Sequence, residues 1–208
     1  MKLYYAPGAC SLSPHITLLE AGLPATLVKV DTKTHRFADG ADFYGVNAKG
    51  YVPVLELDDG RRLTEGPAIV QYLADRNPDS GLAPAAGTFE RYRLQEWLNF
   101  ITSELHKQFS PFFSSTTPAE YKDLLRDKIA GRLGWLADQL DGDYLLGRQF
   151  TVADAYLYTI LRWSKYAGID LARWPRLAAY QARVEARPHV REALLAEGLV
   201  KAPVKAAA

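Results

Sequence analysis

The chain has 208 residues, of which 48% are hydrophobic and 24% charged, as in an ordinary folded globular protein. Its net charge of +1 gives no reason to expect nucleic-acid or acidic-membrane partners, and no apolar run approaches the ~18 residues of a spanning helix. The amino terminus lacks the features of a signal peptide, so we expect a cytoplasmic protein. The single cysteine excludes an intramolecular disulfide, and the histidines show no metal-ligand spacing, so we expect no metal.

The first 80 residues alternate between strand and helix patterns. Period-2 and β-branched patterns predict strands at residues 2–5, 26–30, 54–57 and 62–63. Helices are predicted at residues 11–21, 43–46 and 67–75. We therefore expect a small α/β domain over residues 1–80, followed by a linker at 81–87 that is rich in turn-forming residues.

Beyond the linker the strand signal disappears. Helical periodicity covers residues 88–109, 119–140, 152–167, 176–186 and 189–197, with prolines at the edges of these segments. Residues 88–208 are therefore predicted to form an all-helical domain, whose Ala-rich end KAPVKAAA is expected to fray. Thr151 and Asp154 have the spacing of a capping box at the start of the segment AYLYTILRW. We prefer this structural role for Asp154 over that of a site carboxylate.

The stretch from Gly50 to Leu73 carries two features that suit a small peptide ligand. Pro53 stands at a strand entrance, and a cis bond there would turn the backbone N–H and C=O of Val52 outward, toward an extended ligand. The helix that starts after Glu65 and Gly66 offers unpaired N–H groups, which suit a carboxylate. A backbone clamp beside an anion site suggests a peptide-like, acidic ligand.

Cys10 follows the first strand, where the chain enters the first helix. The helix dipole and nearby N–H groups are expected to lower the pKa of its thiol. A small buried hydrophobic role is equally compatible with its position. Ser11 and Tyr5 lie close by and could supply hydroxyls, although Tyr5 is more naturally a sheet-packing residue.

Asn99, Ser103 and His106 are spaced by four and three residues on one predicted helix, so they line a single stripe. This stripe either faces solvent or faces the first domain across a cleft, and the sequence leaves both open. Aromatic residues further along could make one end of such a cleft apolar, although aromatics at helical spacing more often lie in the core. They are Phe109, Phe112, Phe113, Trp163 and Tyr166.

Together these motifs resemble the cytosolic glutathione transferases, and the pairing of Cys10 with His106 resembles the bacterial beta class. The resemblance is carried by KLYY…PGACS, N47…KG…VP, LTE, Asn99, His106 and FTVADA, in family order over nearly the whole chain. It implies a thioredoxin-like amino-terminal domain, an all-α carboxy-terminal domain and a homodimer. It also implies glutathione as a substrate and no nucleic-acid or membrane partner.

The resemblance also implies specific roles. The backbone of Val52 would pair with the cysteinyl part of glutathione, and Glu65 with Gly66 would hold its γ-glutamyl end. Many members have Ser where Gly66 stands, so one hydrogen bond of roughly 1 kcal/mol would be missing. His35 or Lys33 would meet the glycyl carboxylate. The full implied glutathione site is Cys10, His35, Val52, Pro53, Glu65, Gly66, Asn99, Ser103, Glu104, Leu105 and His106.

The function implied is conjugation of the glutathione thiolate to small hydrophobic electrophiles. Cys10, His106 and Ser11 would be the catalytic residues, and lowering the thiol pKa by about two units would make most of the glutathione reactive at pH 7. The implied electrophile pocket consists of Tyr5, Phe109, Phe113, Trp163 and Tyr166. Two alternatives remain: a glutathione-dependent thiol–disulfide reductase using Cys10 as nucleophile, and a non-catalytic binding protein with the same fold.

Overall fold

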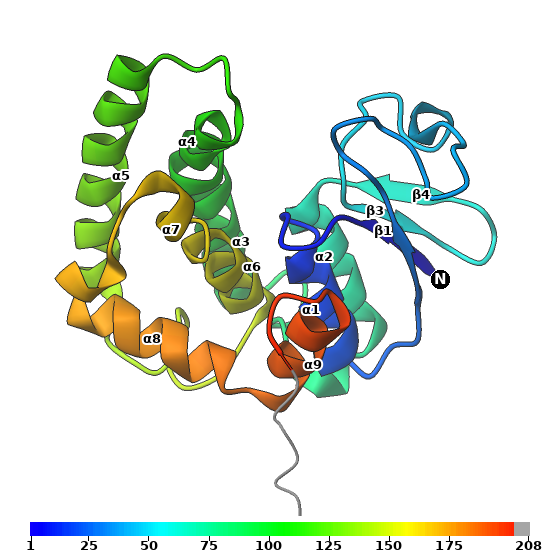
Figure 1. Cartoon of the computed structure of the whole chain (residues 1–208). Coiled ribbons are helices and arrows are strands. Elements are labelled where there is room, and N and C mark those ends of the chain that lie inside the picture. Colours follow the sequence, from blue (N-terminus) through cyan, green and yellow to red (C-terminus); the bar gives the residue numbers. More distant parts are fainter. Residues whose placement is uncertain (202–208) are drawn as a thin grey trace, which may run out of the picture.

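A computed structural model describes residues 1–201, and the rest of the end that was expected to fray lies outside the described residues. The chain forms a sheet-containing amino-terminal domain beside a helical carboxy-terminal domain (Figure 1). The amino-terminal elements are β1 (Lys2–Tyr5), α1 (Leu12–Glu20), β2 (Thr26–Lys29), η1 (Phe43–Gly45), β3 (Val54–Glu56), β4 (Arg62–Thr64), α2 (Gly66–Arg76) and η2 (Pro78–Ser80).

The four-stranded sheet has the order β2-β1-β3-β4. β1 pairs with β2 in parallel, with α1 as the crossover, and β3 pairs with β1 and β4 in antiparallel fashion. Leu3 and Tyr5 of β1 pack with Leu18 of α1 and Ile69 of α2 on one face of the sheet. Tyr5 therefore belongs to this core, and its predicted place in an electrophile pocket is wrong. The alternation of β1 puts Tyr4 on the other face.

The carboxy-terminal domain is helical, as predicted, but two of the expected helices are interrupted. Its elements are α3 (Phe89–Phe100), η3 (Ile101–His106), α4 (Lys107–Phe109), η4 (Ser110–Phe113), α5 (Ala119–Gln139), α6 (Val152–Leu161), α7 (Ser164–Ala167), η5 (Leu171–Arg173), α8 (Pro175–Glu185) and α9 (Pro188–Ala196). The helix predicted at 88–109 contains the π-helix η3, and the one predicted at 152–167 breaks between α6 and α7.

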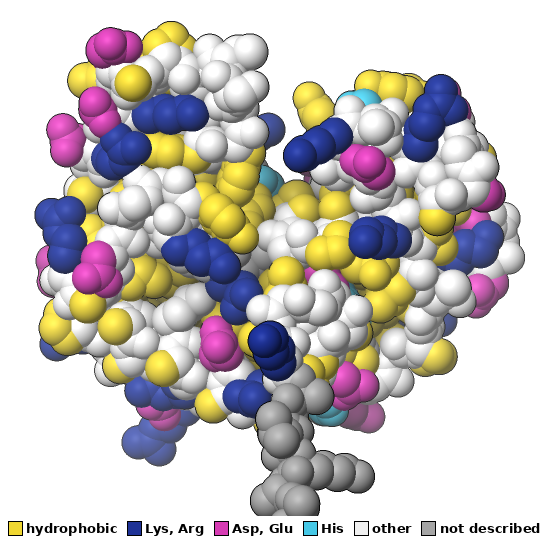
Figure 2. Space-filling view, viewed as in Figure 1, with side chains coloured by type: hydrophobic (Ala, Val, Ile, Leu, Met, Phe, Trp, Pro, Cys, Tyr) yellow, Lys and Arg dark blue, Asp and Glu magenta, His cyan; other side chains and the backbone are white. Residues whose placement is uncertain are grey.

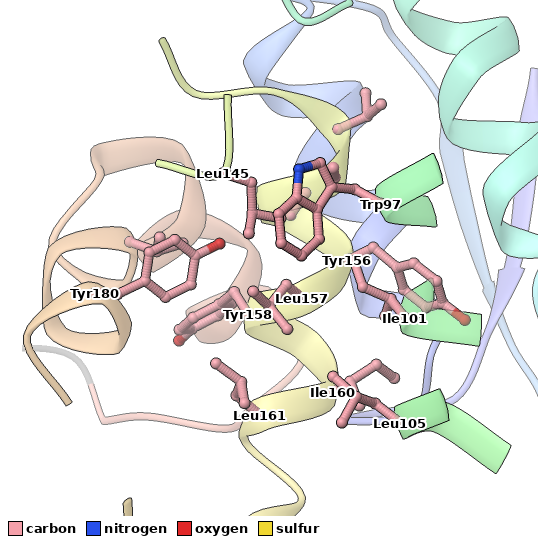
Figure 3. Packing of buried hydrophobic residues seen from close by; sticks show 14 of the residues in the cluster. Trp97, Ile101, Leu105, Leu145, Tyr156, Leu157, Tyr158, Ile160, Leu161 and Tyr180 are labelled. Atoms are coloured by element: carbon pink, nitrogen blue, oxygen red, sulfur yellow. The ribbon is translucent and has the colours of Figure 1, made fainter. Parts of the chain in front are cut away.

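Helix α6 is the centre of the molecule, and all of its residues are buried. Figure 3 shows Tyr156 and Tyr158 on opposite sides of α6, with Tyr158 toward Tyr180 and Tyr156 toward Ile101 of η3. The predicted capping box at its start is confirmed, with Thr151 N–H donating to Asp154 Oδ2 over 2.8 Å. Because α6 also packs against α1, the core continues from one domain into the other.

Candidate active site

The segment that enters β3 has the geometry expected of a backbone clamp. The Val52–Pro53 peptide bond is cis, which is the condition under which Val52 was expected to turn its backbone outward. The loop before it is held by Asn47 Nδ2, which donates to Tyr51 O over 2.7 Å, and by the His35 ring, whose Nδ1 lies 3.0 Å from Gly50 O. The carbonyl oxygen of Val52 accepts a hydrogen bond from Cys10 Sγ at 3.3 Å. The clamp and the single cysteine are therefore direct neighbours.

Cys10 lies between β1 and α1, half-buried, and its thiol is protonated at neutral pH. Desolvation by the surrounding protein raises its pKa to about 11. The N–H groups of Cys10 and Ser11 and the charge of Lys107 favour the thiolate, but they do not offset the loss of water. The expected net lowering of the thiol pKa at this helix start is therefore wrong.

The hydroxyl of Ser11 does not take part in the site. The residue is fully buried, its Oγ donates to Ala6 O over 3.2 Å, and it accepts from Ala6 N–H at 3.1 Å. The side chain thus braces the loop between β1 and α1, and its predicted role as a catalytic hydroxyl is wrong. The Ser11 N–H group still lies close enough to the Cys10 sulfur to lower the pKa of that thiol.

His106 is the last residue of the π-helix η3, and buried aromatic residues surround it. Its Nδ1 lies 2.6 Å from Tyr156 Oη, and its ring meets that of Trp163 edge-on at 5.0 Å. Burial lowers the pKa of the imidazole to about 4, so the ring is neutral at pH 7. Burial also raises the pKa of Tyr156, which keeps its phenol protonated.

His106 Nδ1 and Tyr156 Oη share one hydrogen bond, and its direction depends on the tautomer of the ring. In the tautomer that lets Tyr156 Oη donate to Nδ1, the ring's own proton lies on Nε2. Nε2–H is then the group that His106 can offer to a ligand. Tyr156 was not predicted from the sequence. The only available signal was that it lies seven residues before Trp163, on the same face of the predicted helix.

The predicted stripe of Asn99, Ser103 and His106 assumed a regular α-helix. The wider turn of η3 rotates His106 away from the other two relative to that geometry. Asn99 and Ser103 are exposed, whereas His106 is half-buried. Of the other residues implied here, Glu104 Oε2 accepts from Arg132 Nε over 2.7 Å and the Leu105 side chain is fully buried. Only backbone atoms of Leu105 could therefore reach a ligand.

Glu65 and Gly66 form the start of α2, at the opposite side of the clamp. Glu65 has a positive φ of 69° and its carboxylate lies 2.5 Å from Lys49 Nζ. The negative charge of Glu65 is close enough to raise the pKa of both Cys10 and His106. Gly66 is open: a Cβ added there would meet no atom within 4 Å. The clamp, the thiol, the imidazole and this helix start therefore share one region.

The half-buried His35 side chain supports the loop that precedes the clamp. The residue has a φ of 54°, and its ring lies against that of Tyr44, with centroids 4.8 Å apart and the planes tilted by 36°. Gly50 completes this arrangement, because a Cβ there would lie 2.8 Å from Tyr44 and 2.9 Å from His35. Lys33 is exposed and lies on the same loop.

The aromatic residues expected to line an electrophile pocket divide into two groups. Phe109 is fully buried in the core, so its predicted place in the pocket is wrong. Phe113 and Tyr166 are 53% and 57% exposed, and their rings meet at 5.6 Å. Phe113 also meets the buried Trp163 edge-on at 5.2 Å. Figure 2 shows the surface hollowed between the two lobes, with hydrophobic side chains along the helical side.

Residues 1–201 contain no group of three or more His, Cys, Asp and Glu side chains placed to hold a metal ion. None of the helices described there is both long and apolar enough to cross a membrane.

Comparison with known proteins agrees with this geometry. Family models described as the amino-terminal and carboxy-terminal domains of glutathione S-transferase match residues 8–76 and 100–188. The chain is also 48% identical over 200 residues to glutathione S-transferase GstA of Escherichia coli O157:H7, covering 96% of this chain and all of that protein. The chain belongs to the glutathione S-transferase family.

Solved glutathione S-transferase structures are similar over almost their whole length. A ternary complex of BphK, a bacterial transferase, is 59% identical with a TM-score of 0.93, covering 95% of this chain and 100% of that one. A bacterial beta class transferase of Sphingomonas chungbukensis is 48% identical, with a TM-score of 0.93 and coverages of 96% and 100%. A sphingomonad transferase complexed with glutathione is similar at a TM-score of 0.92 and 48% identity, with the same coverages. The expected beta-class resemblance and the two-domain transferase fold are thereby confirmed.

Proposed function

We propose that this glutathione transferase binds glutathione across the Val52 clamp and the start of α2, and conjugates its thiolate to small hydrophobic electrophiles. The observation that carries the proposal is the contact of 3.3 Å between Cys10 Sγ and Val52 O, at the amino terminus of α1. It places the Val52 carbonyl, a thiol and helix N–H donors within reach of one small peptide. The glutathione-bound structure of a 48% identical transferase supports the choice of ligand.

The bound tripeptide would take over contacts that the free protein makes internally. Its cysteinyl N–H would replace the Cys10 thiol at Val52 O, and its γ-glutamyl carboxylate would meet the N–H of Gly66 at the start of α2. The glutathione sulfur would then receive hydrogen bonds from Cys10 S–H, from the helix N–H groups and from His106 Nε2–H. Each donor stabilises the thiolate and lowers the pKa of the bound glutathione.

The protonation of Cys10 favours conjugation over thiol–disulfide reduction. A reductase needs a thiolate at the attacking cysteine, and thiolates form readily only when the pKa is lowered. With a pKa of about 11, Cys10 remains a thiol at pH 7 and acts as a hydrogen-bond donor. Glutathione itself is then the nucleophile.

The electrophile would lie against the exposed faces of Phe113 and Tyr166, with Trp163 behind them. These rings form an apolar wall beside His106, which suits planar, hydrophobic substrates.

We further propose a homodimer, in which the exposed Asn99 and Ser103 approach the glutathione site of the partner. The molar mass in solution, measured by light scattering, tests the dimer.

The proposal is tested by steady-state conjugation of glutathione to an aryl chloride. We expect His106→Ala to lower kcat/KM about tenfold, and Cys10→Ala to lower it without abolishing conjugation, because neither residue is the nucleophile. His189→Ala, at an exposed histidine of α9, is the matched control and should retain wild-type rates. Wild-type rates in both site variants, or complete loss in Cys10→Ala alone, would contradict the proposal.

A further inference from the structure

Gly8, two residues before Cys10, is held on both sides by the carboxy-terminal domain. Its N–H donates to Glu197 Oε2 over 2.8 Å, and its C=O accepts from Trp163 Nε1–H at 2.9 Å. The residue has a φ of 72°, and a Cβ there would lie 3.3 Å from Leu199 Cδ2. Both hydrogen bonds join segments more than 150 residues apart in the sequence.

Glu197 is a buried carboxylate that the conjugation chemistry does not use. Its side chain has no exposed surface, and its other oxygen, Oε1, lies 2.9 Å from His15 Nδ1. His15 is itself buried and belongs to α1, the helix that begins just after Cys10. One carboxylate thus fixes both the loop that carries the thiol and the helix that points at it.

We infer that Glu197 and Trp163 are positioning residues for the Cys10 loop, which they hold through the backbone of Gly8. The inference rests on the role of Cys10 proposed above. Burying a carboxylate is costly unless it is fully hydrogen-bonded. Here one oxygen of Glu197 binds Gly8 N–H and the other binds the His15 ring. Without the carboxylate, the Gly8 N–H has no partner in the described part of the chain, and the loop gains freedom to move away from Val52.

Movement of the loop has a measurable consequence at the thiol. Cys10 Sγ is protected by its contact with Val52 O and by the surrounding protein, which raises its pKa to about 11. If the loop loosens and this pKa falls by one unit, the thiolate fraction at pH 8 rises about tenfold. Loss of the positioning contact should therefore make Cys10 more reactive toward an added alkylating agent.

The test is the rate of Cys10 alkylation by iodoacetamide at pH 8 without glutathione. Cys10 is the only cysteine, so the gain in mass reports this residue alone. We expect Glu197→Leu to react at least ~5-fold faster than wild type. Glu197→Gln retains an oxygen for Gly8 N–H and an amide for His15, so its rate should be closer to wild type than to Glu197→Leu.

Glu20→Leu is the matched control for a general loosening of the domain contact. Glu20 is also a buried carboxylate of α1, paired with Arg187 at 2.7 Å, but it lies at the far end of the helix from Gly8. It should lower the melting temperature without accelerating alkylation. Equal acceleration in Glu20→Leu, or less than ~5-fold in Glu197→Leu, would overturn the inference.

If Glu197→Leu fails to fold, Trp163→Phe replaces it, since this change removes the donor to Gly8 O while keeping an aromatic ring. Alkylation of Trp163→Phe at the wild-type rate would overturn the inference. The alkylation assay needs no glutathione. If the variants show the expected alkylation rates but the protein does not conjugate glutathione, only the proposed function is contradicted.

Discussion

Cys10 and His106 show how desolvation competes with local charge at single residues. The start of α1 favours a thiolate at Cys10, yet removal of water raises the thiol pKa to about 11. The same cause lowers the pKa of His106 to about 4. Both groups are consequently neutral at pH 7, and each can donate a hydrogen bond to a glutathione thiolate without carrying charge of its own.

The raised pKa predicts an unusual pH dependence for alkylation of Cys10 in the free protein. The thiolate fraction, and with it the rate with iodoacetamide, should rise about tenfold per pH unit from pH 7 to 10 without reaching a plateau. In urea-denatured protein the rate should level off near pH 9, since a free thiol has a pKa of about 8.5. A plateau below pH 9 in the folded protein would contradict the raised pKa.

Tyr156 is expected to support His106 by fixing its tautomer. Tyr156→Phe removes the hydrogen-bond partner of Nδ1, so kcat/KM for conjugation should fall about 2- to 12-fold, as for loss of one hydrogen bond of 0.5–1.5 kcal/mol. Tyr158→Phe is the control, because its hydroxyl donates to Glu185 on the opposite side of α6. Equal kcat/KM values for both variants would count against the assigned tautomer.

Gly66 offers a test in which binding should improve. A serine fits without steric conflict, because no atom lies within 4 Å of an added Cβ, and its hydroxyl would add one hydrogen bond to the γ-glutamyl carboxylate. We expect Gly66→Ser to lower the KM for glutathione about 5-fold, corresponding to about 1 kcal/mol. Gly131→Ser, at an equally open position on α5, should leave the KM unchanged. An unchanged KM in Gly66→Ser would show that the carboxylate lies elsewhere.

At the scale of elements, α6 depends on the groups that close its amino terminus. Asp154 accepts hydrogen bonds from Leu145 N–H, Thr151 N–H, Thr151 Oγ1 and Tyr180 Oη, at 2.8–3.0 Å. It thereby links the preceding loop and α8 to the start of the central helix. Its fully buried position fits this structural role rather than that of a site carboxylate.

Replacement of Asp154 should therefore destabilise the whole protein. Asp154→Ala leaves several buried donors unpaired, and we expect the free energy of unfolding to fall by about 3–5 kcal/mol. Asp170→Ala removes only an exposed cap, where the side chain accepts from Ala172 N–H at 2.9 Å, and should cost about 1 kcal/mol. Urea denaturation of both variants measures the difference. A similar loss for the two would contradict the central role of α6.

At the scale of the whole molecule, features encoded by local patterns could be predicted from the sequence. The strands and the capping box each depend on a few neighbouring residues. The family resemblance then supplied the arrangement of the two domains. The position of Cys10 beside Val52 followed from the fold rather than from any spacing.

Features set by long-range packing could not be predicted. The π-helix η3 lies in a segment whose periodicity indicated an ordinary α-helix. Ser11 and Phe109 were assigned to the site, but both are fully buried in the folded protein. The contacts of Tyr156 with His106 and of Glu197 with Gly8 join residues 50 and 189 positions apart, which no local pattern encodes.

The central claim is that the protein stabilises glutathione as a thiolate, with glutathione rather than Cys10 as the nucleophile. The most direct measurement is a pH titration of the ultraviolet thiolate absorbance of glutathione bound to the Cys10→Ala variant, which contains no other thiol. We predict a bound-thiol pKa of about 7 or below, against about 8.5–9 for a free thiol. A bound thiol that titrates like free glutathione would contradict the account.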